Sequence, residues 1–334
     1  FRTYGYGEVH PGLIVGAYPL DRSDVDRLAL MRVDRVLNLV EDSEYQPGDR
    51  EAIEAALGQS HPETTVLVVD DGSTDETGDV IARYAAHPRF TGVRLAANVG
   101  TAQAKNVGIA LSDAEAITFH DSDDVPHRDK VMRQARVIGN ETIGAHPCLN
   151  WRLSGREPET PIQVGAVLTH HELILPDGER VEIRRTLSLV DDFFPNLQMA
   201  AGVPGDWTHV NSGLFHRSVF DRLGGFSDCI EEDREFRNRL IMAGEVLWVI
   251  PEILLTKIES PDGLTMQGET DYDSPRRIAD RKRVWDAVAR WFATREVDAV
   301  PMDLSMVRIR SCTNPALVDR AALAQLAMRP ERVA

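Results

Sequence analysis

The sequence has few cysteines, few aromatic residues and no long apolar run, and each shortage excludes a class of protein. Three cysteines among 334 residues, widely spaced, cannot form a disulfide framework or match a zinc-binding spacing. No stretch approaches the roughly 18 consecutive apolar residues that a membrane-spanning helix needs. The first ten residues show neither the basic nor the apolar region of a signal peptide. We therefore expect a cytoplasmic protein with no transmembrane segment.

Basic residues are also scarce relative to acidic ones. The chain has 37 Lys and Arg against 53 Asp and Glu, a formal net charge of −16. No basic stripe is present to displace counterions from a polyanion, so nucleic acid is not expected as a partner. A nucleotide remains compatible with this charge, because a bound cation and a few local donors can hold one diphosphate. The acidity itself favours solubility.

Alternating strand and helix patterns fill the first half of the chain and predict an α/β fold, with a sheet covered by helices on both faces. The spacing of Ser73 and Glu76 predicts a capping box at one of the helices. Strands are expected at 35–40, 65–69, 93–95 and 116–119, and helices at 49–57, after 73, at 101–110 and from Pro126 to 138. Later, the pattern predicts a hairpin around 176–178 and helices at 215–223, 234–242 and 278–292.

Two acidic clusters directly follow predicted strands, where ligands bind in sheets of this kind. The first contains Asp70, Asp71 and Gly72. Its carboxylates could accept hydrogen bonds from a nucleotide, or simply cap the next helix. The second contains Asp121 and Asp123. Acidic residues two positions apart at a strand end can hold one hard cation, which makes Asp123 and Asp121 candidate ligands of Mg²⁺ or Mn²⁺. A solvated loop is the alternative for this cluster.

A third acidic group, Glu231-Glu232-Asp233, precedes the helix expected at 234–242. Acidic residues at a helix start are stabilised by the helix dipole, which is a purely structural role. A carboxylate that projects from there into a cleft could instead act as a general base towards a hydroxyl group.

Taken together and in this order, the three groups resemble the family 2 inverting glycosyltransferases of the GT-A fold. The resemblance includes Asn98-Val99-Gly100, a segment around Lys105 where the family usually has Arg, and Gly224-Gly225-Phe226 before the third group. It covers about residues 60–130 and 210–245. It implies a nucleotide-diphospho-sugar transferase fold, a Rossmann-like mixed sheet with helices on both faces.

The resemblance implies a role for each matching residue. Asp233 would be the catalytic base with Glu232 beside it, and Asp123 the main metal ligand with Asp121. The nucleotide would be contacted by Asp71, Asp70, Gly72, Asn98, Gly100, Lys105 and Asp121. It also implies a nucleotide-diphosphate sugar donor of the UDP, GDP or dTDP type, and a hydroxyl-bearing acceptor that is a saccharide, a lipid-linked molecule or a small molecule.

The sequence departs from this family at its start. The family's first strand ends in a turn that touches the base, and here only 36–42 has suitable spacing, so Leu39 and Glu41 are the candidates for that contact. Residues 9–45 also resemble the opening of dual-specificity phosphatases, but the catalytic His-Cys-x5-Arg loop of that family is absent. The Gln-x-x-Arg-Trp motif of processive transferases is absent too, which favours a single transfer.

These observations predict four regions: an N-terminal extension (1–33), a nucleotide-sugar-binding half (34–140), an acceptor-binding and catalytic-base half (141–265) and a C-terminal helical region (266–334). Trp285, Val288, Trp291 and Phe292 form a stripe at helical spacing, which we expect to be core or the surface of a homodimer, with contact to a membrane surface as the alternative because basic residues flank it. Two other functions stay open: a nucleotidyltransferase on a similar sheet, and a nucleotide-sugar-binding protein that has lost turnover.

Overall fold

The computed structural model describes residues 6–10, 13–16, 49–139, 164–184, 209–259, 268, 271 and 273–318. The chain divides into two compact units, Phe1–Gln46 and Pro47–Ala334. In the first unit, β1 (Tyr6–His10) and β2 (Leu13–Gly16) form an antiparallel hairpin. The strand predicted at 35–40 lies outside the described residues. No helix in the described ranges is long and apolar enough to cross a bilayer.

The second unit begins with alternating helices and strands, as the sequence pattern predicts. In chain order these elements are α2 (Asp49–Leu57), β3 (Val66–Asp70), α3 (Thr77–Tyr84), β4 (Phe90–Leu95), α4 (Thr101–Leu111), β5 (Ala116–Thr118), β6 (Val125–Pro126) and α5 (Lys130–Ile138). Its second half contains β7 (Val164–Ile174), β8 (Arg180–Ile183), a short 3₁₀ turn (Val210–Ser212), β9 (Leu214–His216), α7 (Arg217–Leu223), α8 (Glu232–Met242), β10 (Val246–Ile258), α9 (Pro275–Thr294) and β11 (Ile309–Cys312).

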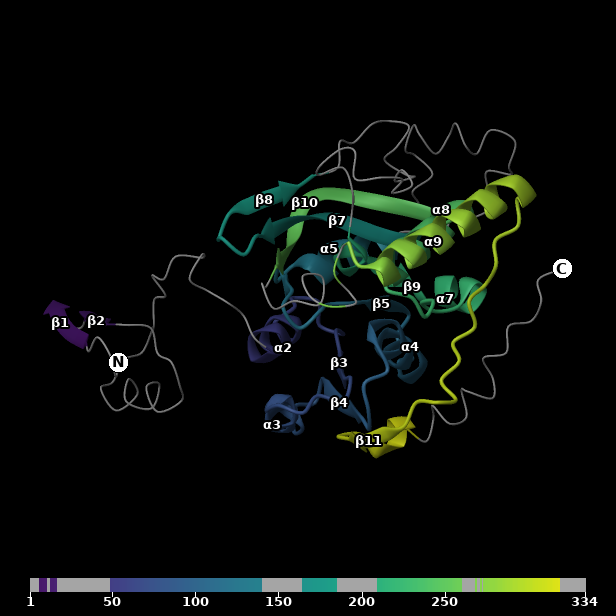
Figure 1. The fold of residues 1–334 in the computed structure, drawn as a ribbon. Coiled ribbons are helices and arrows are strands. Elements are labelled where there is room, and N and C mark those ends of the chain that lie inside the picture. The colour runs from purple at the N-terminus through teal and green to yellow at the C-terminus, as the bar shows by residue number, and fades with distance from the viewer. Residues whose placement is uncertain are drawn as a thin grey trace. The chain divides into compact units, whose positions relative to one another are not determined.

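The strands of this unit form two sheets. A three-stranded sheet has the order β11-β4-β3, with β3 parallel to β4 and β11 antiparallel to β4. The other has the order β5-β9-β7-β10-β6, and β8 pairs with β7. In Figure 1 the long parallel strands β7 and β10 run side by side in the upper part of the unit, with β3, β4 and β11 below them. This mixed α/β arrangement confirms the predicted fold class.

An aromatic core fixes the end of β5 against the start of α8. The ring of Phe119, which follows β5, meets that of Phe226 edge-on with centroids 5.1 Å apart. Phe226 in turn lies 4.5 Å from Phe236 of α8. The buried side chain of Asn106 in α4 accepts a hydrogen bond from the Phe226 amide and donates one to its carbonyl oxygen. These contacts hold the second and third acidic groups at a fixed separation.

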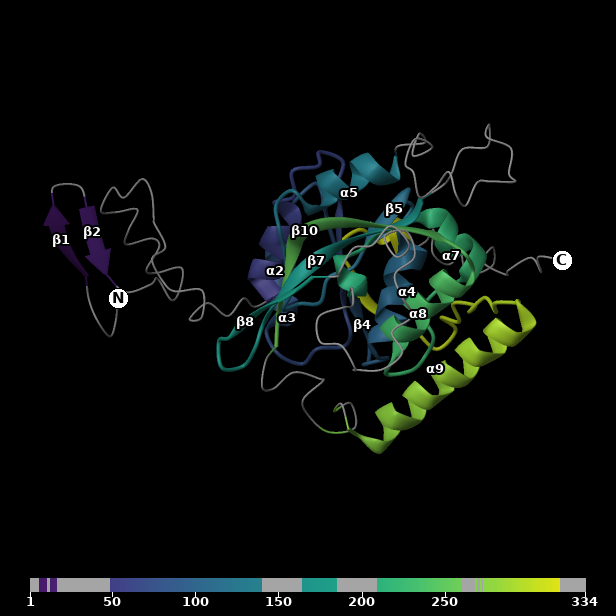
Figure 2. The same ribbon diagram turned by 90° about the horizontal axis from the view of Figure 1, so that it is seen from above.

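Helix α9 lies along one side of the unit next to α8 (Figure 2). Of the predicted stripe, Val288 and Trp291 are buried against Met242 and Val297, while Phe292 is 57% exposed. The inner part of the stripe is therefore core.

Two local predictions are wrong. The capping box does not form, and α3 begins at Thr77. The Ser73 amide, which would donate to Glu76 in a capping box, donates to Asp70 Oδ1 instead, at 2.8 Å. Pro126 does not open a helix. It ends β6, which pairs with β10, and α5 begins four residues later. A proline is tolerated there because β6 is at the edge of its sheet.

Candidate active site

One cavity of about 2080 Å³ collects most of the residues singled out in the sequence. It is lined by all residues of β3 and β5 and by the starts of α8 and α9. Asp70, Asp71, Asn98, Gly100, Lys105, Asp121, Asp123, Glu232 and Asp233 all line it. Gly72 lies in the turn beside them, and Leu39 and Glu41 lie outside the described residues. The structure thus brings together acidic groups from three separate stretches of chain.

The carboxylates of the turn after β3 accept hydrogen bonds from β4 and from the loop before α4. Asp71 accepts hydrogen bonds from the amides of Val99 at 2.7 Å and Gly100 at 2.9 Å. Asp70 accepts from Arg94 Nε at 2.6 Å. Burial raises the pKa of Asp71, although the two amides oppose this shift. Asp71 therefore fixes the loop that leads into α4, the helix whose N-terminus faces the cavity.

Gly72 permits this turn because its backbone lies in the left-handed region, with φ of 76°. A Cβ atom there would lie 2.6 Å from the carbonyl carbon of Ala97 and the nitrogen of Asn98. The turn and the loop before α4 therefore approach each other more closely than any side chain would allow.

Asp121, Asp123 and Asp124, called here the acidic cluster, can place one oxygen each within 4.8 Å of one another. Asn211 donates to Asp124 Oδ2 at 2.9 Å, while Asp124 Oδ1 is buried with no hydrogen-bond partner among the described residues. Burial raises the pKa of Asp124 to about 7 and raises that of Asp123. Burial also opposes ionisation of Asp121, but Lys257 and Lys105 outweigh it and lower that pKa.

Lys257 balances part of this charge from β10. Its Nζ lies 3.6 Å from Asp121 Oδ2 and 3.7 Å from Asp124 Oδ1. Burial lowers the pKa of Lys257, but the acidic cluster raises it by more, so the side chain is charged. Sequence reasoning missed Lys257 and did not select Asp124 as a ligand. A lysine inside the apolar run Leu254-Leu255-Thr256-Lys257-Ile258 was the available signal.

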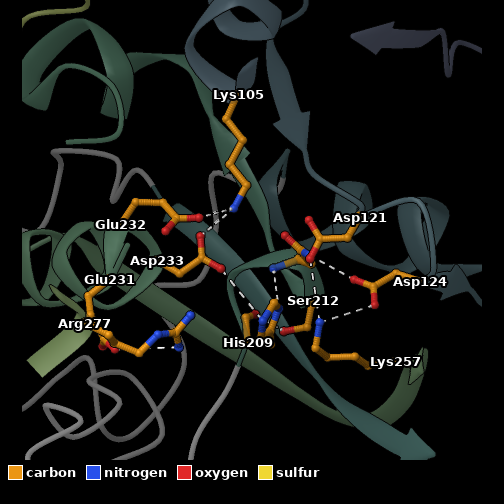
Figure 3. Close-up of polar contacts among 11 residues, drawn as sticks. Lys105, Asp121, Asp124, His209, Ser212, Glu231, Glu232, Asp233, Lys257 and Arg277 are labelled. Atoms are coloured by element: carbon orange, nitrogen blue, oxygen red, sulfur yellow. Dashed lines mark hydrogen bonds and ion pairs between the residues drawn. The ribbon is translucent and has the colours of Figure 1, made fainter. Parts of the chain in front are cut away.

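Lys105 of α4 points toward the third acidic group (Figure 3). Its Nζ lies 2.7 Å from Asp233 Oδ1 and 3.2 Å from Glu232 Oε1. Burial raises the pKa of Glu232 to about 7, with Lys105 opposing that shift. Asp233 is the more open of the two, with 27% of its side chain exposed. His209 Nε2 lies 3.8 Å from Asp233 Oδ2, and burial keeps the pKa of His209 well below 6.5, so the ring is neutral.

Basic residues of α9 reach the same cavity wall. Arg281 lies 3.1 Å and Arg277 3.8 Å from Glu231 Oε1, and Arg234 also pairs with Glu231. Glu231 therefore anchors the start of α9 to the start of α8. Sequence patterns could not predict the contacts of Glu231 with α9, because Arg281 lies 50 residues further along the chain.

Comparison with known proteins gives a consistent match to one family. The model of glycosyl transferase family 2 matches residues 50–172. The chain is 35% identical over 89 residues to a Bacillus subtilis protein named as the teichuronic acid biosynthesis glycosyltransferase TuaG, which covers 26% of this chain and 35% of that protein. It is 33% identical over 181 residues to an uncharacterized glycosyltransferase of Rickettsia bellii, which covers 54% of this chain and 23% of that protein. The matched stretch is thus about a third or less of these relatives' length.

Some solved structures have a distant likeness to this chain. Residues 1–349 of S. aureus TarS in complex with UDP are 16% identical, with a TM-score of 0.44, over 74% of this chain and 70% of that one. A mannosyltransferase of Pyrobaculum calidifontis in complex with GDP-Man and Mn²⁺ is 19% identical, with a TM-score of 0.43, over 90% and 80% of the two chains.

The match to the family model includes β3 with its acidic turn, α4 and the acidic cluster, while the third acidic group, Glu231-Glu232-Asp233, lies beyond the matched residues. Residues 50–172 are therefore similar to glycosyl transferase family 2, and they lie within a mixed α/β fold.

Proposed function

We propose that this chain is a non-processive, inverting glycosyltransferase. It moves a sugar from a UDP-, GDP- or dTDP-type donor to a hydroxyl-bearing acceptor and requires Mg²⁺ or Mn²⁺. The observation that supports this most strongly is the meeting of Asp71, Asp123 and Asp233 at one cavity. They come from three stretches of chain far apart in sequence, which a set of unrelated helix caps would not bring together.

The acidic cluster fits a divalent cation. Its three carboxylates offer oxygen ligands within 4.8 Å of one another, the donor set that hard cations prefer. The buried Asp124 Oδ1, which lacks a hydrogen-bond donor among the described residues, is a further acceptor available to an ion. Asp123 and Asp121 would hold the cation, with Asp124 as a third ligand. When bound, such an ion offsets the charge that develops on a leaving diphosphate.

The donor would lie between the turn after β3 and the start of α4. Asp71 holds the Val99 and Gly100 amides in place, and α4 has eleven residues, long enough for its N-terminus to attract a phosphate. Asp70, Gly72 and Asn98 complete this wall.

Asp233 is the proposed general base. It accepts the proton of the acceptor hydroxyl as the acceptor oxygen bonds to the anomeric carbon. The bond from that carbon to the phosphate oxygen breaks, and the nucleoside diphosphate leaves with the electron pair. Because attack and departure occur on opposite faces, the configuration inverts. Lys105 holds the Asp233 carboxylate in place at 2.7 Å, and the neighbouring Glu232 is the more buried of the two acids.

Donor turnover tests this proposal directly. The full chain is incubated with UDP-, GDP- and dTDP-sugars, with Mn²⁺ or with EDTA, and the products are separated by chromatography. We expect slow release of one nucleoside diphosphate with Mn²⁺ and none in EDTA. Release of pyrophosphate would indicate a nucleotidyltransferase instead, and tight donor binding without any product would indicate a binding protein.

A further inference from the structure

His209 has a contact with the proposed base that the proposed chemistry does not use. Its Nε2 lies 3.8 Å from Asp233 Oδ2, whereas Lys105 Nζ lies 2.7 Å from Asp233 Oδ1. Both His209 and Asp233 line the cavity. The two oxygens of the Asp233 carboxylate therefore have different surroundings, because an ion pair holds Oδ1 and an imidazole ring faces Oδ2 (Figure 3).

The backbone determines which nitrogen of the His209 ring carries the proton. The Asn211 amide can only donate, and it donates to His209 Nδ1 at 3.2 Å, so Nδ1 is an acceptor. A neutral imidazole has one N–H group, which must then be on Nε2. A hydrogen-bond donor therefore faces Asp233 Oδ2.

The His209 ring is fixed by packing and by the turn that follows it. The ring meets that of His171 of β7 edge-on, with centroids 6.0 Å apart. The His209 carbonyl oxygen accepts hydrogen bonds from the amide of Ser212 at 3.0 Å and from its hydroxyl at 2.6 Å. In the same turn, Asn211 donates to Asp124 Oδ2 at 2.9 Å. The turn thus links the acidic cluster to the proposed base and sets the direction of the His209 ring.

The distance between His209 Nε2 and Asp233 Oδ2 fits one hydroxyl group. At 3.8 Å the two atoms are too far apart for a direct hydrogen bond, which needs about 3.2 Å or less. One hydroxyl oxygen can, however, lie at about 2.8 Å from both atoms. Such an oxygen accepts a hydrogen bond from the Nε2–H group and donates its own proton to Oδ2.

We propose that His209 is a second protein contact of the acceptor hydroxyl group. Its Nε2–H donates to the hydroxyl oxygen, while Asp233 Oδ2 accepts the hydroxyl proton. One lone pair of the oxygen then faces His209, and the other forms the bond to the anomeric carbon as the bond from that carbon to the leaving diphosphate breaks. The proton of His209 stays in place, and its contact orients the attacking oxygen. This role rests on the proposed function, because it requires Asp233 to be the base.

Two substitutions separate this role from the structural contact of the ring with the Asn211 amide. The side-chain oxygen of Asn can take the place of Nδ1, and the side-chain nitrogen of Gln can take the place of Nε2. His209→Asn therefore keeps the acceptor for the amide and loses the donor to the hydroxyl, and His209→Gln does the reverse. The probe reaction is hydrolysis of a nucleotide sugar by the full chain with Mn²⁺, in which water is the hydroxyl acceptor.

We expect His209→Asn to lower kcat by roughly 10–100-fold, with the KM for the donor and the melting temperature unchanged. His209→Gln should keep kcat within about threefold of the wild-type value. It should melt about 2 °C lower, because the turn loses its cap. Release of nucleoside diphosphate at varied donor concentration measures kcat and KM, and thermal unfolding measures the melting temperature.

His216 provides the matched control. Its Nδ1 accepts from the Ser218 amide at 3.3 Å, which is the same kind of cap at the start of α7. It has no contact with Asp233 among the described residues. His216→Asn and His216→Gln should therefore both keep the wild-type kcat, and only His216→Gln should melt at a lower temperature.

Wild-type kcat in His209→Asn would overturn the proposal, as would a loss of about tenfold or more in His209→Gln. The second outcome decides the matter even where His209→Asn does not fold. A wild-type chain without any turnover would overturn the proposed function, and the role of His209 with it. Turnover that falls in Asp233→Asn but not in His209→Asn would leave the proposed function intact and remove only His209.

Discussion

Lys105 is the residue on which the electrostatics of the site depends most. It is a single cation with 8% of its side chain exposed, and two carboxylates contact it. Holding the buried Glu232 beside a second carboxylate is costly unless a counter-charge is present. The resemblance in sequence places Lys105 at the nucleotide, whereas the geometry makes it a positioning residue for Asp233 and Glu232 as well.

Lys105→Ala should therefore destabilise the fold by about 3 kcal/mol at neutral pH, because it removes the cation beside the buried Glu232 and the partly exposed Asp233. The loss should depend on pH. Removing Lys105 raises the pKa of Glu232 above its present value of about 7, so protonation of Glu232 offsets the loss in acid, and the destabilisation grows as the pH rises. Denaturant unfolding at about pH 5 and pH 8 measures this.

The matched control is Lys282→Ala, because Lys282 pairs with Asp286 on the exposed side of α9, where both side chains are well exposed. That variant should change the free energy of unfolding by less than about 0.5 kcal/mol at either pH. If Lys105→Ala were equally harmless, the ion pairs around Asp233 would not hold the site together.

Asp233→Asn tests the catalytic assignment with almost no change in shape. Asn cannot take a proton from a hydroxyl, so turnover should fall by roughly 10²–10⁴-fold while donor affinity is kept. Steady-state release of nucleoside diphosphate measures turnover, and a binding titration measures donor affinity. Asp286→Asn, at an exposed residue that does not line the cavity, should leave both unchanged. Wild-type turnover in Asp233→Asn would remove Asp233 from the mechanism.

At the scale of single elements, the sequence predicted those helices and turns whose formation depends mainly on neighbouring residues. The bounds of α2 and the hairpin of β7 and β8 follow from apolar periodicity and a Pro-Asp-Gly turn. Strand β10 was missed because Pro251 and Glu252 interrupt its apolar run, and the structure absorbs them as an irregularity in the pairing with β7. Lys257 was missed with it. The pairing of β10 with β7, which is distant in sequence, stabilises this strand, and the local sequence pattern alone is too weak to predict it.

The turn after β3 is the element most sensitive to substitution. Gly72 and Gly244 both have φ of 76°, but a Cβ at Gly244 would have nothing within 4 Å. Gly244→Ala should therefore cost only the left-handed conformation, about 1 kcal/mol. Gly72→Ala must also displace the backbone of Ala97 and Asn98.

We expect Gly72→Ala to destabilise the chain by at least about 1 kcal/mol more than Gly244→Ala, and to weaken donor binding, because the loop held by Asp71 moves. Thermal unfolding and a nucleotide titration on the two variants test this. Equal losses of stability, with donor affinity unchanged in both, would mean that the close approach at Gly72 has no functional role.

At the scale of the whole molecule, the sequence motifs predicted that acidic groups far apart in the chain would meet, and the cavity contains them. What the motifs could not predict are the cations that face these groups. Lys257 comes from β10, and Arg277 and Arg281 come from α9. The net charge of −16 says nothing about such local balance, which only tertiary packing determines.

The central claim is that the acidic cluster holds a divalent cation to which a nucleoside diphosphate binds. Isothermal titration of UDP, GDP and dTDP into the full chain, with Mn²⁺ and with EDTA, tests it most directly when repeated on Asp123→Ala. The account predicts that one nucleotide binds with Mn²⁺, that EDTA abolishes this binding, and that Asp123→Ala abolishes it as well. The same affinity in EDTA as in Mn²⁺ would contradict the account.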